Sequence, residues 1–186
     1  MDFFLKAKHW QIFLIVIGIP VLIEIIEGLT VLSSDNEANA FRTILKLLLM
    51  VPLIALYSWL YAVGSLMQNR INSLLDTKSS YFPFLIYTSA IAAFLSLILA
   101  LFYWQQLLMA SAFIYVGFGV VVFMSVATLF LAVSFVAKTL VMAERNAEVR
   151  SSDFYGEYVM ILFFFIGIWL LQPRVNELYE QELSTH

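Results

Sequence analysis

Residues 112–137 read AFIYVGFGVVVFMSVATLFLAVSFVA, an apolar stretch without a single charged side chain. A helix needs about 20 mainly apolar residues to cross the roughly 30 Å hydrocarbon core of a bilayer. This stretch is longer than that, and it is also too long for an ordinary buried strand. It therefore predicts a transmembrane helix.

Three further apolar stretches of spanning length precede it, at residues 10–32, 44–67 and 81–104. A fifth, at residues 155–172, has a shorter uncharged core from Tyr158 to Leu171. It reaches spanning length when the residues at both of its ends are counted at headgroup level. We predict an all-α integral membrane bundle of five transmembrane helices. The alternative is four spans plus a fifth segment that is re-entrant or interfacial.

The composition excludes several classes of protein. Hydrophobic residues make up 62% of the 186 residues and charged residues 12%, against roughly 45–50% and about 25% in a soluble domain. The chain has no cysteine, which excludes disulfides and thiolate chemistry. Its net charge of -3 gives no basis for nucleic-acid binding. No linker divides the chain, so we expect a single transmembrane domain over residues 1–186.

Lysine and arginine residues set the expected orientation, because cytoplasmic loops are enriched in both. With the N-terminus inside, the cytoplasmic side receives Lys6, Lys8, Arg70, Lys78, Lys138, Arg145 and Arg150. The outer side keeps Arg42, Lys46 and Arg174, together with the acidic stretch at residues 33–40. We predict a multi-pass membrane protein with its N-terminus in the cytoplasm and its C-terminus outside. Residues 138–153 are expected to extend the fourth helix into the cytoplasm.

Small side chains recur at spacings of three and four in the spans. In the third span they are Ser89, Ala92, Ala93, Ser96 and Ala100, and in the fourth Gly117, Ser125, Thr128 and Ala132. Such faces let helix backbones approach closely in lipid, where hydrophobic association contributes little. We expect an antiparallel hairpin of the third and fourth helices, and small-residue faces that bind a protein partner or a second copy of the chain. The alternative is that these residues line a pore.

Glu24 and Glu27 lie three residues apart on one face of the first span, in its outer half. A carboxylate held in hydrocarbon without a partner tends to take up a proton, and intramembrane acids mark ion or proton sites. The alternative is that the helix ends near Gly28, which leaves both side chains within reach of water, or of Arg42 and Lys46. The pair is therefore a candidate site with a structural alternative.

A second set of candidate residues lies at the cytoplasmic junction of the fourth and fifth segments: Glu144, Arg145, Arg150, Asp153, Gly156 and Glu157. Asp153 is expected to cap the next helix, and Glu157 suits the positive end of the helix dipole. Both acids are expected to face the same pocket as Arg145 or Arg150. This arrangement predicts an ion-pair latch or a docking surface, with a purely structural role as the alternative. Gly156 permits close approach of another helix.

The C-terminal part combines Asp153, Gly156-Glu157 and Gly167-Ile168-Trp169 with the ending Gln172-Pro173-Arg174 and Asn176. It resembles the C-terminal part of a group of uncharacterised bacterial polytopic integral membrane proteins with a DxxGE turn and a GIWxxQPRxN ending. The resemblance implies a polytopic bacterial protein, and hence a location in the bacterial cytoplasmic (inner) membrane, but no particular activity. On physical grounds we expect Pro173 to stop the fifth helix, Arg174 to meet lipid phosphates and Trp169 to lie near the membrane surface.

The sequence contains no recognisable catalytic constellation. Its two histidines, His9 and His186, stand near the ends of the chain, and no HExxH helix, GxSxG elbow or phosphate-binding glycine loop occurs. We expect no metal and no cofactor. The first hypothesis is a non-enzymatic membrane component, such as a scaffold or subunit. The second is a small transporter or ion-coupled channel that uses Glu24 and Glu27, and the third is a membrane-embedded hydrolase or lipid-modifying enzyme.

Overall fold

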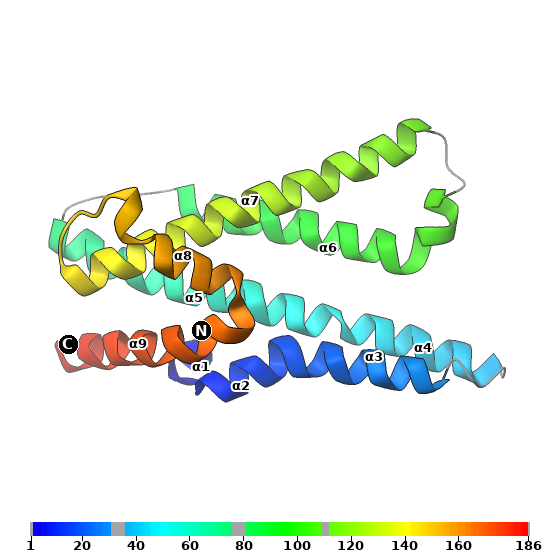
Figure 1. The fold of residues 1–186 in the computed structure, drawn as a ribbon, viewed down its shortest axis with the longest axis horizontal. Coiled ribbons are helices and arrows are strands. Elements are labelled where there is room, and N and C mark those ends of the chain that lie inside the picture. Colours follow the sequence, from blue (N-terminus) through cyan, green and yellow to red (C-terminus); the bar gives the residue numbers. More distant parts are fainter. Residues whose placement is uncertain (1, 31–35, 76–80, 109–111, 186) are drawn as a thin grey trace.

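The computed structural model describes residues 2–30, 36–75, 81–108 and 112–185. Every regular element within these ranges is a helix, which confirms the predicted all-α class (Figure 1). In chain order the elements are α1 (Asp2–Lys6), α2 (His9–Phe13), the π-helical turn η1 (Leu14–Gly18), α3 (Ile19–Thr30), α4 (Asn36–Leu48), α5 (Met50–Leu75), α6 (Tyr81–Leu108), α7 (Ala112–Arg145), the 3-10 helix η2 (Ser151–Asp153), α8 (Tyr155–Leu162) and α9 (Phe164–Thr185).

Within the described residues, four helices are long and apolar enough to cross a membrane. They cover His9–Leu29, Thr43–Asn72, Tyr81–Leu101 and Phe113–Arg145. The first four predicted spans are thus confirmed as helices. The second is longer than predicted, because α4 already begins at Asn36, inside the stretch expected to be an acidic loop. Asp35 and Lys78, which also entered the charge analysis, lie outside the described residues.

The first of these helices is distorted at its centre. Ile19 donates its backbone N–H to the carbonyl oxygen of Leu14, five residues back, which gives the π-helical turn η1. Pro20 follows directly and has no N–H to donate, so the regular α-helical bonding pattern is interrupted at this point. The chain absorbs the irregularity in one turn, and α3 continues to Thr30.

α6 and α7 form the antiparallel hairpin that their small residues predict (Figure 1). Ser89 of α6 is buried, and its hydroxyl donates to the backbone carbonyl oxygen of Ser125 in α7 at 3.3 Å. The same hydroxyl lies 2.7 Å from Tyr57 Oη of α5, so this contact joins three helices. Gly117 is exposed, and no described atom of another segment lies within 4 Å of where its Cβ would be. Its predicted place in the interface is therefore wrong.

The fifth predicted span is not one continuous helix. α8 ends at Leu162, Phe163 adopts φ -90° and ψ 56°, and α9 begins at the next residue. The two helices fold back on each other, so that α9 returns toward the end of the bundle from which α8 starts (Figure 1). At about 1.5 Å per residue, a helix as short as α8 covers much less than the roughly 30 Å of hydrocarbon. The structure therefore does not confirm the predicted fifth span over residues 155–172.

Gly167 makes the reversal between α8 and α9 possible. A Cβ at this position would lie 1.8 Å from the backbone carbonyl oxygen of Met160. The backbones of α8 and α9 therefore come so close at Gly167 that any side chain at this position would clash. After the reversal α9 runs on through Pro173, so the expectation that Pro173 stops the helix is also wrong.

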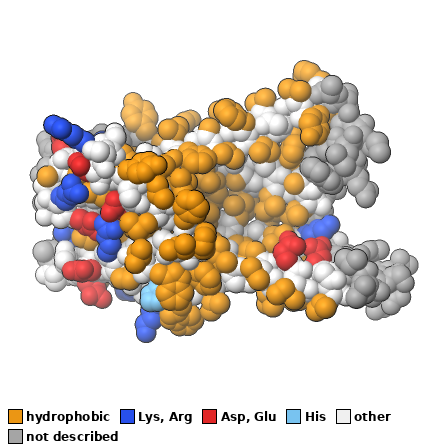
Figure 2. All heavy atoms as spheres, in the orientation of Figure 1, with side chains coloured by type: hydrophobic (Ala, Val, Ile, Leu, Met, Phe, Trp, Pro, Cys, Tyr) orange, Lys and Arg blue, Asp and Glu red, His pale blue; other side chains and the backbone are white. Residues whose placement is uncertain are grey.

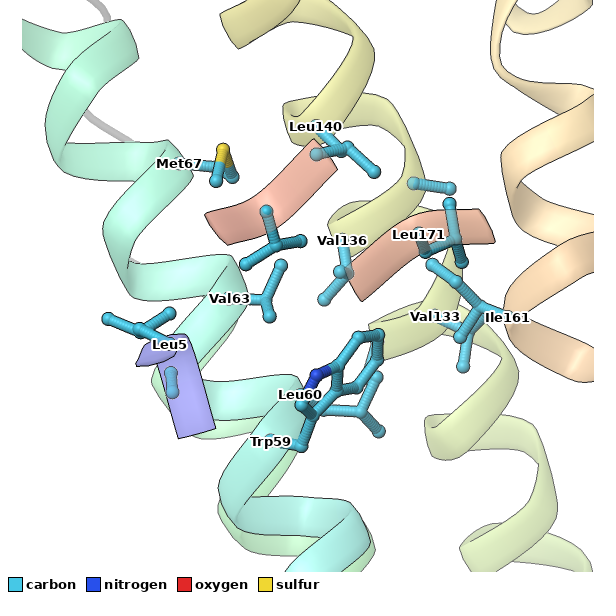
Figure 3. Close-up of a cluster of buried hydrophobic side chains, with 14 of the residues drawn as sticks. Leu5, Trp59, Leu60, Val63, Met67, Val133, Val136, Leu140, Ile161 and Leu171 are labelled. Carbon is cyan, nitrogen blue, oxygen red and sulfur yellow. The ribbon is translucent and has the colours of Figure 1, made fainter. Parts of the chain in front are cut away.

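The hydrophobic core lies at the end of the bundle that contains α9 and α1 (Figure 1), and Figure 3 shows some of its side chains in close-up. Its fully buried side chains come mainly from α5, α6, α7 and α9 and include Trp59, Leu60, Val63, Met67, Phe82, Val136, Leu140, Ile168 and Leu171. Leu5 of α1 packs into the same cluster. The start of the chain and its last helix are thus parts of one core.

The opposite half of the molecule packs much less tightly. Ile91 of α6 and Phe113 and Val116 of α7 are 68%, 88% and 62% exposed. Figure 2 shows apolar side chains over much of the visible face, while most charged side chains gather at the end that contains the C-terminus. Such an apolar surface is unfavourable in water and suits the hydrocarbon of a bilayer.

Replacing Gly167 by Ala should destabilise the fold, because the added Cβ would clash with the carbonyl oxygen of Met160. Gly156→Ala is the matched control, since no described atom of another segment lies within 4 Å of its added Cβ. Thermal unfolding in detergent should show a clear loss of Tm for Gly167→Ala and almost none for the control. An unchanged Tm for Gly167→Ala would contradict the close approach of α8 and α9.

Candidate functional site

Gln172 of α9 lies fully buried in the core. Its side-chain oxygen accepts a hydrogen bond from Trp59 Nε1 of α5 at 2.7 Å. Its side-chain nitrogen donates to the backbone carbonyl oxygens of Phe4 and Ala7, at 2.8 and 3.0 Å. The last carbonyls of a helix need partners from outside it, and α1 ends at Lys6. Gln172 therefore caps α1 and joins it to α5 and α9.

Arg174 follows on the same helix and joins α9 to α7 and α8. Its Nε and Nη2 lie 2.7 and 2.5 Å from the two carboxylate oxygens of Glu144, and Nη2 lies 2.9 Å from Glu157 Oε1. The three side chains are 32%, 26% and 16% exposed, in the order Arg174, Glu144 and Glu157. The hydrogen bond with Glu144 raises the pKa of Arg174 above its usual value, so the guanidinium stays charged. We call these three residues the Arg174 cluster.

Arg70 of α5 adds another link to α9. Its Nη1 donates to the carbonyl oxygen of Leu178 at 3.3 Å, and its Nη2 donates to Gln181 Oε1 at 3.1 Å. A cavity of about 290 Å³ lies between these groups and the Arg174 cluster, and Asn146 also lines it. The charged end of the bundle is thus held together by contacts among α5, α7, α8 and α9.

The predicted latch residues come together in a pairing that differs in part from the expected one. Arg145 Nη1 lies 3.8 Å from Asp153 Oδ2, as expected, but the Arg145 side chain is 56% exposed and such pairs contribute little. Glu157 pairs with Arg174 instead of Arg145 or Arg150. Arg150 donates its backbone N–H to Asp153 Oδ2 at 2.9 Å. The partly buried ion pairs therefore depend on Arg174, which the latch prediction did not include.

The helical extension predicted over residues 138–153 ends at Arg145. Asn146 has a φ of 49°, in the left-handed region that asparagine tolerates at the end of a helix. Asp153 accepts a hydrogen bond at the start of η2 and does not cap α8, which follows Phe154. The predicted cap of the next helix is therefore wrong.

Trp169 lies beside the start of the first long helix, and Gly156 differs from its expected role. Trp169 is 46% exposed and packs against His9 and Phe13 of α2, with ring centroids 4.4 and 5.8 Å apart. Its expected place near a membrane surface stays a prediction. Gly156 is exposed, and the close helix contact expected there occurs at Gly167.

Sequence reasoning placed Arg174 and Glu144 on opposite sides of the membrane, whereas the structure brings their side chains into contact. The reason is the reversal at Phe163, which no local pattern in the sequence marks clearly. One signal was available, because the uncharged core of this segment is shorter than those of the other spans. The importance of Gln172 was also missed, since its partners come from α1 and α5.

Glu24 and Glu27 lie on α3, near the end of the bundle opposite the Arg174 cluster (Figure 1). Both fall within the apolar helix His9–Leu29. Glu24 is exposed and Glu27 is half-buried. The structure therefore keeps the two candidate sites apart.

Within the part of the chain that the structure describes, no three His, Cys, Asp or Glu residues could hold a metal ion. In comparisons with known proteins, no protein family, no curated protein and no solved structure matches this chain. The resemblance of its C-terminal motif to bacterial membrane proteins stays a prediction.

Replacing Gln172 by Leu should lower the free energy of unfolding by about 2 kcal/mol, because the Trp59 N–H and two carbonyl oxygens would be buried without partners. Adding Trp59→Phe removes the unpaired donor, so the double variant should lose less than the sum of the two single losses. Glu180→Leu, at an exposed position of the same helix that takes part in none of these contacts, is the control. Reversible unfolding in mixed micelles measures all four variants. Strict additivity would show that Gln172 and Trp59 are not coupled.

Proposed function

We propose that this chain is a non-enzymatic component of the bacterial cytoplasmic membrane, a scaffold or subunit that docks a protein partner at its cytoplasmic end. The observation that carries the proposal is the Arg174 cluster. Both oxygens of Glu144 and one oxygen of Glu157 are occupied by one arginine. Carboxylates used in this way link helices and are poorly placed to act as acids, bases or nucleophiles.

The proposed topology has four transmembrane helices and a re-entrant hairpin of α8 and α9, with both termini in the cytoplasm. The contact between Arg174 and Glu144 supports it, because residues in contact lie on the same side of a membrane. Once Arg174 is counted on that side, only Arg42 and Lys46 of the chain's lysines and arginines remain on the other. The difference in positive charge between the two sides of the membrane is then larger than with five spans. A larger difference agrees with the enrichment of lysine and arginine in cytoplasmic loops.

The proposed docking surface consists of Arg145 at the end of α7 and of Asn146 and Arg150 after it, all of which are exposed. Their backbone has a defined course, since Asn146 ends α7 in the left-handed conformation and Asp153 accepts the N–H of Arg150. Exposed arginines on such a backbone suit an acidic segment of a partner, because complementary charge speeds encounter and selects the partner.

Replacing Arg145 and Arg150 together by Ala should greatly reduce recovery of the partner when the tagged protein is purified from its native membrane in mild detergent. The Tm should change little, because both side chains are exposed. Lys8→Ala is the control, since it removes an exposed charge near α1 and not from the docking surface. Recovery of a lone monomer in several detergents would argue against the proposal. Equal recovery with the double variant would remove this surface from it.

A further inference from the structure

A second cavity, of about 350 Å³, lies between α5, α7 and the segment that follows α7. It has no lining residue in common with the cavity beside the Arg174 cluster. Its volume falls within the roughly 300–1,000 Å³ typical of small-molecule sites. Size alone does not identify a ligand. The polar groups of the cavity wall and the depth of the cavity in a membrane restrict the ligand further.

Five polar side chains line this cavity, namely Gln68, Asn72, Lys138, Thr139 and Glu148. The side-chain oxygen of Asn72 is buried and accepts no hydrogen bond from the described residues. Lys138 and Glu148 are exposed, and neither forms an ion pair within the described part of the chain. A buried acceptor without a donor is unfavourable, and a ligand can supply the donor. A cation, an anion and an acceptor around one cavity suit a ligand that carries both charges.

The rest of the cavity wall is apolar. Ile71 and Met142 are buried, and Phe135 is half-buried beside them. Lys138 is the first charged residue of α7 after the uncharged run 112–137, and Arg70 is the first of α5. The cavity therefore lies at the depth where the hydrocarbon of a bilayer gives way to lipid headgroups.

We propose that this cavity binds the headgroup of phosphatidylethanolamine. Lys138 pairs with the phosphate, while Glu148 and Asn72 Oδ1 accept hydrogen bonds from the ammonium group. The first part of an acyl chain lies along Phe135, Ile71 and Met142. The inference rests on the transmembrane placement of α5 and α7, and it does not require the docking of a protein partner.

The test uses purified full-length protein and native mass spectrometry with equal amounts of phosphatidylethanolamine and phosphatidylglycerol in detergent. The wild type should retain phosphatidylethanolamine in preference. Lys138→Met should weaken retention of both lipids about tenfold, the loss expected for one charge-assisted hydrogen bond. Glu148→Gln and Asn72→Leu should weaken only phosphatidylethanolamine, because phosphatidylglycerol has no ammonium group. Lys8→Met should change neither.

Equal retention of the two lipids by the wild type would overturn the proposal. So would an unchanged ratio in Glu148→Gln and Asn72→Leu, or a loss in Lys8→Met as large as that in Lys138→Met. Displacement of the lipid by an equal concentration of free O-phosphoethanolamine would overturn the assignment to a membrane lipid. Because no protein partner takes part in these measurements, their failure is separate from failure of the docking proposal.

Discussion

Arg174 contacts Glu144 of α7 and Glu157 of α8 at the same time, and this contact fixes where α8 and α9 lie relative to α7. A guanidinium that binds both oxygens of a carboxylate defines distance and orientation together. Removing one member of such a partly buried group leaves the remaining charge without its partner, which costs more than the group contributes when complete. The contact therefore holds α9 at the end of the bundle where α7 ends.

With α9 in that position, one of its faces completes the core. Ile168, Leu171, Val175 and Leu178 are buried and recur at helical spacing, and Gln172 stands among them. Gln172 reaches Trp59 and the end of α1 only because this face is turned toward α5. The apolar helices extend away from this closed end and expose their side chains. The molecule thus combines a well-packed charged end with an apolar surface suited to lipid.

The helical class and the first four long helices follow from sequence because they depend on local properties, namely length and the absence of charge. The hairpin of α6 and α7 was predictable in part, since Ser89 and Ser125 belong to faces that the spacing reveals. The path of α8 and α9 was not. It depends on contacts between distant residues, such as Gln172 with Ala7 and Arg174 with Glu144, and no pattern within residues 155–172 encodes them. Arg145 and Asp153, which are close in sequence, form one of the pairs that the sequence left open.

The central claim is that the end of α7 and the C-terminal half of α9 lie on the same side of the membrane. Asn146 and Gln181 are both exposed and line the same cavity, and the cysteine-free chain allows a spin label at each. Electron paramagnetic resonance on the protein in lipid nanodiscs should give a separation far below the roughly 30 Å of the hydrocarbon core. A separation equal to or greater than that thickness would mean that residues 155–172 cross the membrane, and would contradict the account.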